Sequence, residues 1–245
     1  MDVAEIYRQL TETALAQGFH CEAYGQIGNY PLPAFRRDAN GEKTQIYLSS
    51  GIHGDEPAGV HAILRLLQSG FFDQRARWLM CPMLNPSGLA ANKRENFQGL
   101  DLNRDYRALA SEEIRTHRSW LASQAPYQLA LSLHEDWETT GFYLYEINTS
   151  PYPCVGPAVL QQTCKIIATE SNALLDGHEV TSPGYILHRP EADEPTNWPE
   201  AIYHVKLHPV LSCTFETPSQ LPLEQRIRTH VAATTAAVEK FLSQL

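Results

Sequence analysis

Long apolar runs are missing from this sequence. No stretch approaches the roughly 18 consecutive apolar residues that a membrane-spanning helix needs. The first residues, up to Gly18, contain Asp2, Glu5, Arg8 and Glu12, which interrupt the apolar segment that a secretory signal peptide requires. We therefore expect no signal peptide and no membrane partner.

Cysteine and clustered positive charge are scarce as well. The chain has 5 cysteines, an odd number, and no two of them form a Cys-x-x-Cys pair. This argues against a disulfide framework and favours reduced thiols, so we expect a cytoplasmic protein. Lys and Arg (19) are scattered and are outnumbered by Asp and Glu (28), which gives a formal charge of −9. That balance argues against a nucleic-acid-binding surface.

What is present suits one large globular domain spanning residues 1–245. The chain is 43% hydrophobic and 19% charged, which is enough to build a sizeable core. Apolar periodicity predicts helices over 3–15, 57–70, 111–123, 155–175 and 223–242, and strands within 20–50 and over 78–83, 129–133, 141–147 and 210–215. Residues 85–107 and 177–200 read as long loops. Strands that alternate with helices predict an α/β fold with a mixed sheet.

A pair of metal-binding residue types follows one of these predicted strands. His53 and Glu56, in the segment Gly51-Ile-His-Gly-Asp-Glu, come directly after the apolar run Ile46–Ser50. Zinc accepts neutral imidazole nitrogen and carboxylate oxygen, and catalytic zinc sites use three protein ligands. Such a pair also occurs by chance on solvated turns, and a metal site would need one more ligand from elsewhere.

Two further strand ends carry suitable side chains. The apolar strand Leu129–Leu133 delivers His134 at its carboxyl end, where an open α/β sheet presents functional groups. Beside a His-x-x-Glu pair, we interpret His134 as the third ligand rather than as a structural histidine. The strand Leu211–Phe215 places Glu216 at its exit, where a carboxylate suits the general base that a metal-activated water needs. Without a metal site nearby, Glu216 would be read as a solvent-facing residue.

The loop over residues 85–107 supplies arginines and an amide. Arg94 is followed by Asp101-Leu-Asn103-Arg104. An arginine binds a carboxylate through two parallel hydrogen bonds, and an adjacent asparagine can fix the orientation of the same group. A second arginine aimed at a scissile carbonyl would stabilise the oxyanion that develops there. Taken alone, both arginines would be read as surface residues.

In this order, the motifs resemble those of the zinc metallocarboxypeptidases, the family of the pancreatic carboxypeptidases A and B. The matching segments are Gly-Ile-His53-Gly-Asp-Glu56, Asn85-Pro-Ser-Gly88, Arg94, Asp101-Leu-Asn103-Arg104, His134 and Phe215-Glu216. The resemblance implies a central mixed sheet of about eight strands flanked by helices. It also implies one zinc ion per chain, held by His53, Glu56 and His134. Its other implied roles are Glu216 as general base, Arg94 as oxyanion stabiliser, and Asn103 with Arg104 as the binding residues for a terminal carboxylate.

This resemblance favours a single-domain metallopeptidase without a pro-segment that releases a C-terminal amino acid. The segment His134–Glu138, leading into Gly141-Phe-Tyr143, is more similar to the small bacterial branch that includes the rapid-encystment carboxypeptidase. Within that segment, Glu135 and Asp136 raise the question of a second metal ion. The same triad occurs in the succinylglutamate desuccinylase and aspartoacylase branch, which makes an N-acyl amino acid amidohydrolase the alternative. Either substrate, peptide or acyl-amino acid, carries a free carboxylate; a non-catalytic zinc-binding domain is the least favoured hypothesis.

The resemblance also implies a mobile tyrosine that covers the substrate, between the third ligand and the catalytic glutamate. We assign this role to Tyr185, because it lies on the second predicted loop where a lid could move, with Tyr203 as the competitor. Asp193 or Glu194 on the same loop would line a side-chain pocket and prefer a basic residue. Loop carboxylates of this kind are otherwise solvated.

Overall fold

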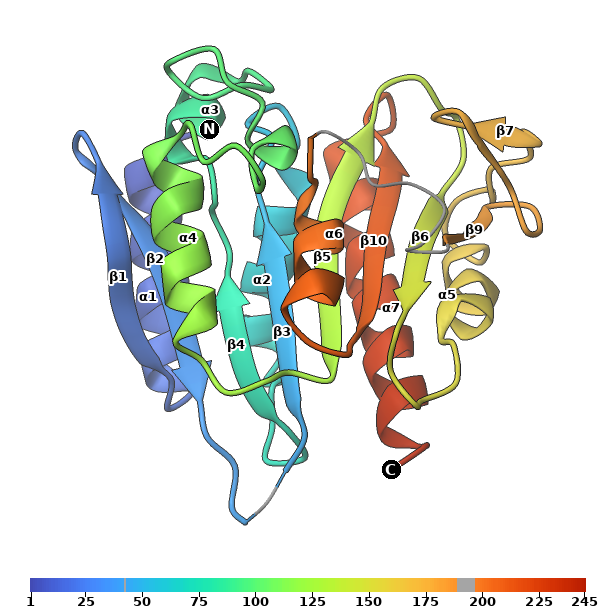
Figure 1. The fold of residues 1–245 in the computed structure, drawn as a ribbon, viewed down its shortest axis with the longest axis horizontal. Coiled ribbons are helices and arrows are strands. Elements are labelled where there is room, and N and C mark those ends of the chain that lie inside the picture. Colours follow the sequence, from blue (N-terminus) through green and yellow to red (C-terminus); the bar gives the residue numbers. More distant parts are fainter. Residues whose placement is uncertain (42, 189–196) are drawn as a thin grey trace.

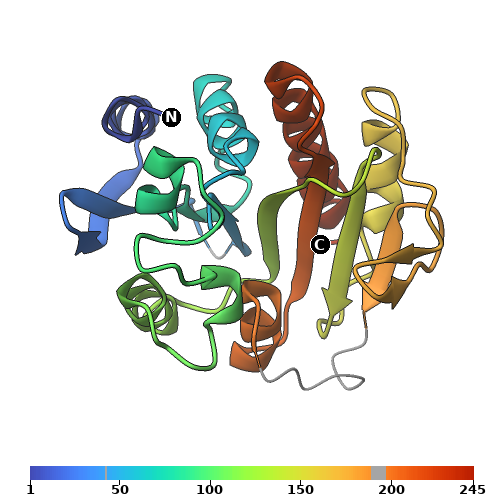
Figure 2. The same cartoon turned by 90° about the horizontal axis from the view of Figure 1, so that it is seen from above.

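An eight-stranded mixed sheet runs through the molecule, with helices packed on both of its faces (Figures 1 and 2). The computed structural model describes residues 1–41, 43–188 and 197–245. The strand order is β1 (His20–Ile27), β2 (Tyr30–Arg37), β4 (Arg77–Cys81), β3 (Gln45–Ser50), β5 (Leu129–Asp136), β10 (Leu211–Pro218), β6 (Tyr143–Asn148) and β9 (Tyr185–His188). Strands β4, β3, β5 and β10 are mutually parallel, whereas β2 pairs antiparallel with β1 and β4, and β6 with β10. The predicted α/β fold with a mixed eight-stranded sheet is confirmed.

The helices form one layer on each side of the sheet (Figure 2). One layer contains α1 (Val3–Ala16), α2 (Ala58–Gln68), α5 (Gly156–Thr163) and α7 (Leu223–Leu242), and the other contains α4 (Glu112–Ala122) and α6 (Glu200–Leu207). Each layer buries its own apolar cluster, because successive side chains of a strand point to opposite faces. On β5, for example, Leu131 and Leu133 join the cluster under α2 and α7, while Ala130 joins the cluster under α4 and α6.

The predicted helix over 155–175 is wrong in its second half. Helix α5 ends at Thr163, and the chain then turns towards the sheet. There Phe142 donates a backbone hydrogen bond to Ala168 and accepts one from Glu170, at 2.8 and 2.9 Å. This pairing overrides the helical apolar pattern, and the segment continues into a small separate hairpin of β7 (Leu174–Leu175) and β8 (His178–Glu179).

The two segments predicted as long loops also contain regular structure. Residues 85–107 include α3 (Pro86–Ala91) and the short 3₁₀ helix η1 (Leu102–Arg104). The side chains of Asn85 and Asp101 cap these two elements by accepting backbone hydrogen bonds, both of 2.9 Å. Residues 177–200 include β8, β9 and the start of α6. Polar caps organise the first of these segments, so that apolar periodicity does not reveal it.

The topology brings three strand ends to one edge of the sheet. Strands β3, β5 and β10 are neighbours and parallel, so their carboxyl ends coincide. Ser50 at the end of β3 lies opposite Leu133, and His134 lies opposite Glu216. In open α/β sheets this edge is where ligands bind.

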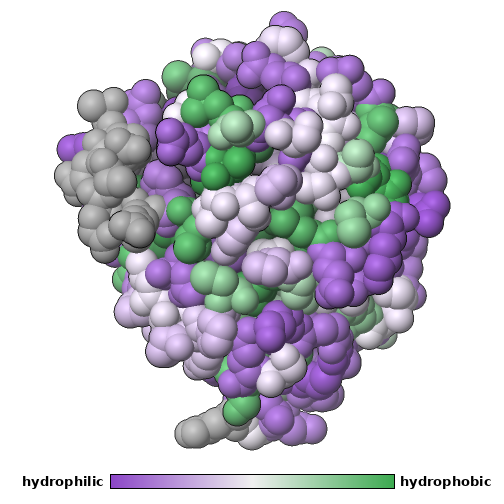
Figure 3. Space-filling model, turned by 90° about the vertical axis from the view of Figure 1, so that its right-hand side faces the viewer, coloured by the Kyte–Doolittle hydropathy of each residue, from purple (hydrophilic) through white to green (hydrophobic). Residues whose placement is uncertain are grey.

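The described helices, the cysteines and one face of the surface show no further specialised feature. In the described part of the chain, no helix combines the length and the apolar character that crossing a bilayer requires. All 5 cysteines are free. The face on the right-hand side of Figure 1 carries small apolar groups separated by polar side chains (Figure 3), as is usual for a surface in contact with water.

Candidate active site

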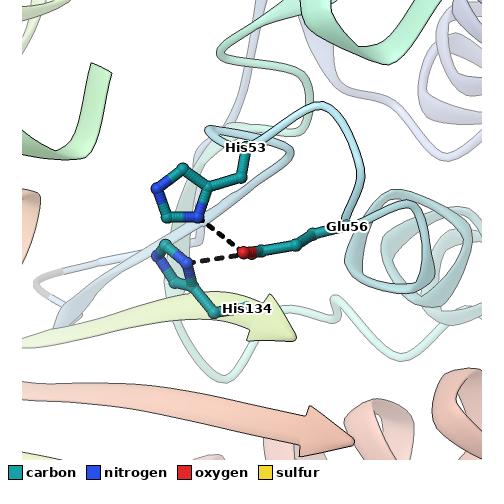
Figure 4. A group of neighbouring side chains, drawn as sticks. All are labelled: His53, Glu56 and His134. Atoms are coloured by element: carbon teal, nitrogen blue, oxygen red, sulfur yellow. Dashed lines mark hydrogen bonds and ion pairs between the residues drawn. The ribbon is translucent and has the colours of Figure 1, made fainter. Parts of the chain in front are cut away.

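Three buried side chains, His53, Glu56 and His134, converge above the ends of β3 and β5 (Figure 4). Their candidate ligand atoms all lie within 4.8 Å of one another. The Nδ1 atom of His53 is 2.6 Å from Oε1 of Glu56, and Nδ1 of His134 is 3.1 Å from Oε2 of the same carboxylate. Among the residues that the structure describes, this is the one group of three His, Cys, Asp or Glu side chains with such spacing.

Close backbone packing holds the turn that carries His53 and Glu56. A Cβ atom on Gly54 would lie only 1.9 Å from the carbonyl carbon of Gly88, at the start of α3. The Gly54 backbone N–H also donates to the Arg94 carbonyl at 3.3 Å, and Asn85 donates its side-chain N–H to that carbonyl at 3.2 Å. The Gly-Ile-His-Gly and Asn-Pro-Ser-Gly motifs therefore form one packed unit.

Asp101 orients one of the candidate ligands, a role that the sequence analysis did not assign to it. Its Oδ1 atom is 3.2 Å from Nε2 of His53, and its Oδ2 atom accepts a hydrogen bond from Nε of Arg94 at 3.1 Å. When Nε2 of His53 donates to Asp101, Nδ1 is left with the lone pair that faces Glu56 and His134. Metal-binding histidines usually donate their other ring N–H to a carboxylate, a backbone carbonyl or water, and Asp101 offers the first of these. The only sequence signal was the position of Asp101 beside Asn103 and Arg104.

The electrostatics of the group favour a bound cation. Burial lowers the pKa of His53, but Glu56 and Asp101 more than offset this effect and raise that pKa to about 9. Burial likewise opposes ionisation of Glu56, yet the two histidines hold its pKa far below the ordinary value. The pocket therefore concentrates negative charge between two imidazole nitrogens, and this donor set fits a divalent metal ion that would replace the bridging proton.

Glu216 lies next to this group on the neighbouring strand. The sequence predicted it at a strand exit, but β10 continues to Pro218, and Glu216 is in register with His134 inside the parallel pair. Burial raises the pKa of its carboxyl group well above the ordinary value, and the negative charges of Glu56 and Asp136 add to the increase. A nearby cation would act in the opposite direction and favour the carboxylate form.

The residues predicted to bind the terminal carboxylate, Asn103 and Arg104, border the same cavity, which has a volume of about 630 Å³. Its lining includes the three candidate metal ligands together with Arg94, Asn103, Arg104 and Glu216. Arg94 approaches the ligand group, with its Nη1 atom 3.6 Å from Oε1 of Glu56. Arg104 is exposed, and its Nη1 atom donates to the Asn103 carbonyl at 3.0 Å. The structure thus brings these predicted residues to one cavity.

Tyr185 does not reach this cavity. It lies on β9 rather than on a loop, it is buried, and its hydroxyl donates to Oε2 of Glu146 at 2.8 Å in the layer of α5. Tyr203 is buried too, and it stacks on Tyr106 with ring centroids 5.3 Å apart. We therefore withdraw both as candidates for a substrate-covering tyrosine. Asp193 and Glu194, the predicted specificity residues, lie outside the described residues.

Two tyrosines that the sequence analysis did not single out do line the cavity. Tyr143 and Tyr145 alternate along β6 and face the same side of the sheet as Glu216. The Tyr143 hydroxyl donates to Oδ2 of Asp136 at 2.9 Å. Period-2 alternation in the predicted strand over 141–147 was the signal that would have identified them.

Glu135 and Asp136, the two residues that raised the question of a second metal ion, both have protein partners. The Glu135 carboxylate accepts a hydrogen bond from the Ala58 backbone at 2.7 Å and pairs with Arg226. Asp136 accepts from Tyr143 and, at 2.8 Å, from the Glu138 backbone.

Comparison with known proteins is consistent with this geometry. The family model described as the succinylglutamate desuccinylase/aspartoacylase catalytic domain matches residues 42–154. Carboxypeptidase 2 of Trichophyton rubrum is 31% identical over 103 residues, which is 38% of this chain but only 19% of that protein. A solved structure of a proposed metallopeptidase from Shewanella amazonensis has a TM-score of 0.85 at 25% identity, covering 98% of this chain and 93% of that one. Carboxypeptidase A of Helicoverpa armigera has a TM-score of 0.69 at 14% identity, covering 96% and 71%.

Fold and site together define an enzyme of the metallocarboxypeptidase-like fold. These matches support the resemblance to the zinc carboxypeptidase-like family that the sequence motifs indicated.

Proposed function

We propose that the protein is a zinc-dependent carboxypeptidase that hydrolyses the amide bond next to a free carboxylate and releases a C-terminal amino acid. One observation carries this proposal: the candidate metal ligands, a carboxylate base and an arginine–asparagine pair border one cavity of about 630 Å³. A cavity of this size suits a short peptide end, since small-molecule sites span about 300–1,000 Å³.

His53, Glu56 and His134 would hold the zinc ion, because two imidazole nitrogens and one carboxylate oxygen are a common catalytic zinc set. When bound, zinc supplies Lewis-acid polarisation of a carbonyl and of water. Asp101 keeps the His53 ring oriented through the 3.2 Å contact with its Nε2 atom.

The remaining residues take separate roles in the reaction. The guanidinium of Arg104 and the amide of Asn103 bind the terminal carboxylate and thereby position the scissile bond. Arg94 donates to the oxyanion that develops on the scissile carbonyl. Glu216 takes a proton from the attacking water and passes it to the nitrogen of the scissile amide. The amino acid is then released with a neutral amine in place of an amide anion.

The second candidate is an N-acyl amino acid amidohydrolase. The match of residues 42–154 to the succinylglutamate desuccinylase/aspartoacylase catalytic domain supports it. Its substrates would also carry a free carboxylate, so the same arginine and asparagine would serve. The cytoplasmic location inferred from composition stays a prediction.

A substrate comparison on zinc-loaded protein tests both functions. Short N-blocked peptides with a free C-terminus, the same peptides as C-terminal amides, and acetyl- or succinyl-amino acids would be assayed side by side. We expect the free-acid peptides to be hydrolysed at least about tenfold faster than the amides, as the loss of a hydrogen-bonded charged group predicts. Hydrolysis of acyl-amino acids alone would favour the second candidate, and equal rates on acids and amides would exclude the carboxylate-binding role.

Arg104→Ala provides the matching site test. The variant should lose the preference for free-acid peptides while keeping its fold and metal content, because Arg104 is exposed at the cavity rim. A variant that retains the full preference would remove Arg104 from the proposed site.

A further inference from the structure

A fully buried carboxylate lies below the cavity, at the first residue of α6. The side chain of Glu200 is 1% exposed, and it is absent from the chemistry described above. Its Oε2 atom accepts hydrogen bonds from the hydroxyls of Ser49 and Ser132, at 2.8 and 2.9 Å, and its Oε1 atom accepts from the Tyr47 hydroxyl at 2.9 Å. A buried carboxylate would be very costly without such partners.

These partners connect α6 to the strands that carry the candidate metal ligands. Ser49 lies on β3, four residues before His53, and Ser132 lies on β5, two residues before His134. The Glu200 side chain therefore ties the first turn of α6 to two central strands just below the metal group. Burial opposes ionisation of Glu200, but His204 and the hydrogen bond from Ser49 keep its pKa below the ordinary value, so the carboxylate is charged.

The backbone of the same residue contacts the proposed substrate site. The N–H of Glu200 donates to Oδ1 of Asn103 at 2.9 Å. A backbone N–H can only donate, so the oxygen of the Asn103 amide has to lie on this side. The Asn103 nitrogen, with its two N–H donors, is then the part of the amide left for the cavity that Asn103 lines.

We propose that Glu200 is a positioning residue: its buried carboxylate fixes the start of α6, so that its backbone N–H holds the Asn103 amide with the nitrogen directed to the substrate carboxylate. The inference rests on the proposed function, because it concerns the carboxylate-binding part of that site. A wrongly turned amide would present an oxygen to the substrate carboxylate and repel it.

Glu146 offers a matched control on the opposite face of the sheet. Its side chain is also completely buried, and its oxygens accept hydrogen bonds from the backbone at the start of α5 (Val155 and Gly156, both 2.9 Å) and from the Tyr185 hydroxyl. Glu146→Gln and Glu200→Gln thus remove the same charge from equally buried positions next to a helix start.

The test measures the ratio of kcat/KM for an N-blocked peptide with a free C-terminus to kcat/KM for its amide. We expect Glu200→Gln to lower this ratio at least about tenfold, mainly through a higher KM for the free acid. Glu146→Gln should lower the melting temperature but leave the ratio unchanged. If wild type itself shows no preference for the free acid, the proposed function fails; if wild type shows it and Glu200→Gln keeps it, only the present inference fails.

Asn103→Asp keeps the inference testable even if Glu200→Gln does not fold. The aspartate retains an oxygen for the Glu200 N–H but replaces the cavity-side nitrogen by a second oxygen of negative charge. The preference for the free acid should then fall further than in Asn103→Ala. A ratio equal to that of wild type in Asn103→Asp would overturn the proposed orientation.

Discussion

Replacing Glu216 by glutamine should lower kcat and at the same time stabilise the metal-free protein. The carboxylate is necessary for the proposed chemistry, but its burial destabilises the folded state. Glutamine keeps the shape of the residue and the parallel pairing of β10 with β5, where Glu216 lies opposite His134. It removes the proton acceptor. General-base catalysis contributes about 10²–10⁴-fold, so we expect kcat to fall by that factor, equivalent to about 3–5 kcal/mol of transition-state stabilisation.

The same substitution should stabilise the metal-free protein. Burial and the charges of Glu56 and Asp136 raise the pKa of Glu216, which means that the folded state disfavours its ionised form. Removing an unfavourable buried carboxylate of this kind typically stabilises a protein by about 0.5–2 kcal/mol. In a chain of this size, each kcal/mol raises the melting temperature by about 2–4 °C. Because the folded-state pKa is raised, the gain should vanish below about pH 4.5, where the wild-type carboxyl is protonated in both states, and increase as the pH rises.

The assay combines steady-state kinetics on zinc-loaded protein with thermal melts of the metal-free protein at several pH values. Glu179→Gln, which removes an exposed carboxylate on β8 outside the cavity lining, serves as the control and should change neither quantity appreciably. A Glu216→Gln variant that keeps more than about a tenth of the activity would exclude Glu216 as the general base. A loss of bound zinc or a lower melting temperature at neutral pH would instead show that Glu216 has a structural role.

Three other predictions concern the Gly54 turn, the buried side chain of His117 and the metal ion. Gly54→Ala should lower the free energy of unfolding by more than the roughly 1–3 kcal/mol that overpacking usually costs. The reason is that the new Cβ atom would lie 1.9 Å from a backbone atom of Gly88. Denaturant titration checks this against Gly25→Ala, whose Cβ would meet only side-chain atoms at 3.0 Å; equal costs would contradict the role of the contact. Burial lowers the pKa of His117 from 6.5 to about 4, so on acidification the unfolded chain takes up the proton before the folded protein does. The free energy of unfolding should therefore decrease by up to about 3 kcal/mol as the pH falls from 6.5 to about 4. Urea denaturation at stepped pH would reveal it, and a flat profile would mean that His117 is not neutral when folded. Chelation should abolish turnover and lower the melting temperature, and added zinc should restore both; activity that survives exhaustive chelation would exclude metal from the reaction.

The convergence of the ligand candidates was predictable because each one follows a recognisable apolar strand. His53 comes after Ile46–Ser50, and His134 and Glu216 end predicted strands of their own. Parallel neighbours then place these residues at one edge without any knowledge of loop structure. The roles assigned to them are still predictions, but their proximity is confirmed.

The environments of other residues depend on contacts that no local pattern encodes. Tyr185 reads as a loop residue among prolines, yet pairing with β6 turns its side chain towards α5. Asp101 and Glu200 gain their importance from partners 48 and 151 residues away, namely His53 and Ser49. Polar contacts at such separations depend on the register of several strands at once, so composition and periodicity do not predict them.

The in-register pairing of Glu216 with His134 also matters for protein engineering. Adjacent strands in a sheet are about 4.8 Å apart, so the spacing between the proposed base and the third ligand is a property of the backbone ladder and not of any loop. The segments that surround the cavity, such as β7 and β8, can therefore be exchanged to alter substrate choice without changing the spacing between Glu216 and His134. A one-residue slip of β10 would have the opposite effect, since it would turn Glu216 towards α7 and its buried apolar neighbours towards the cavity.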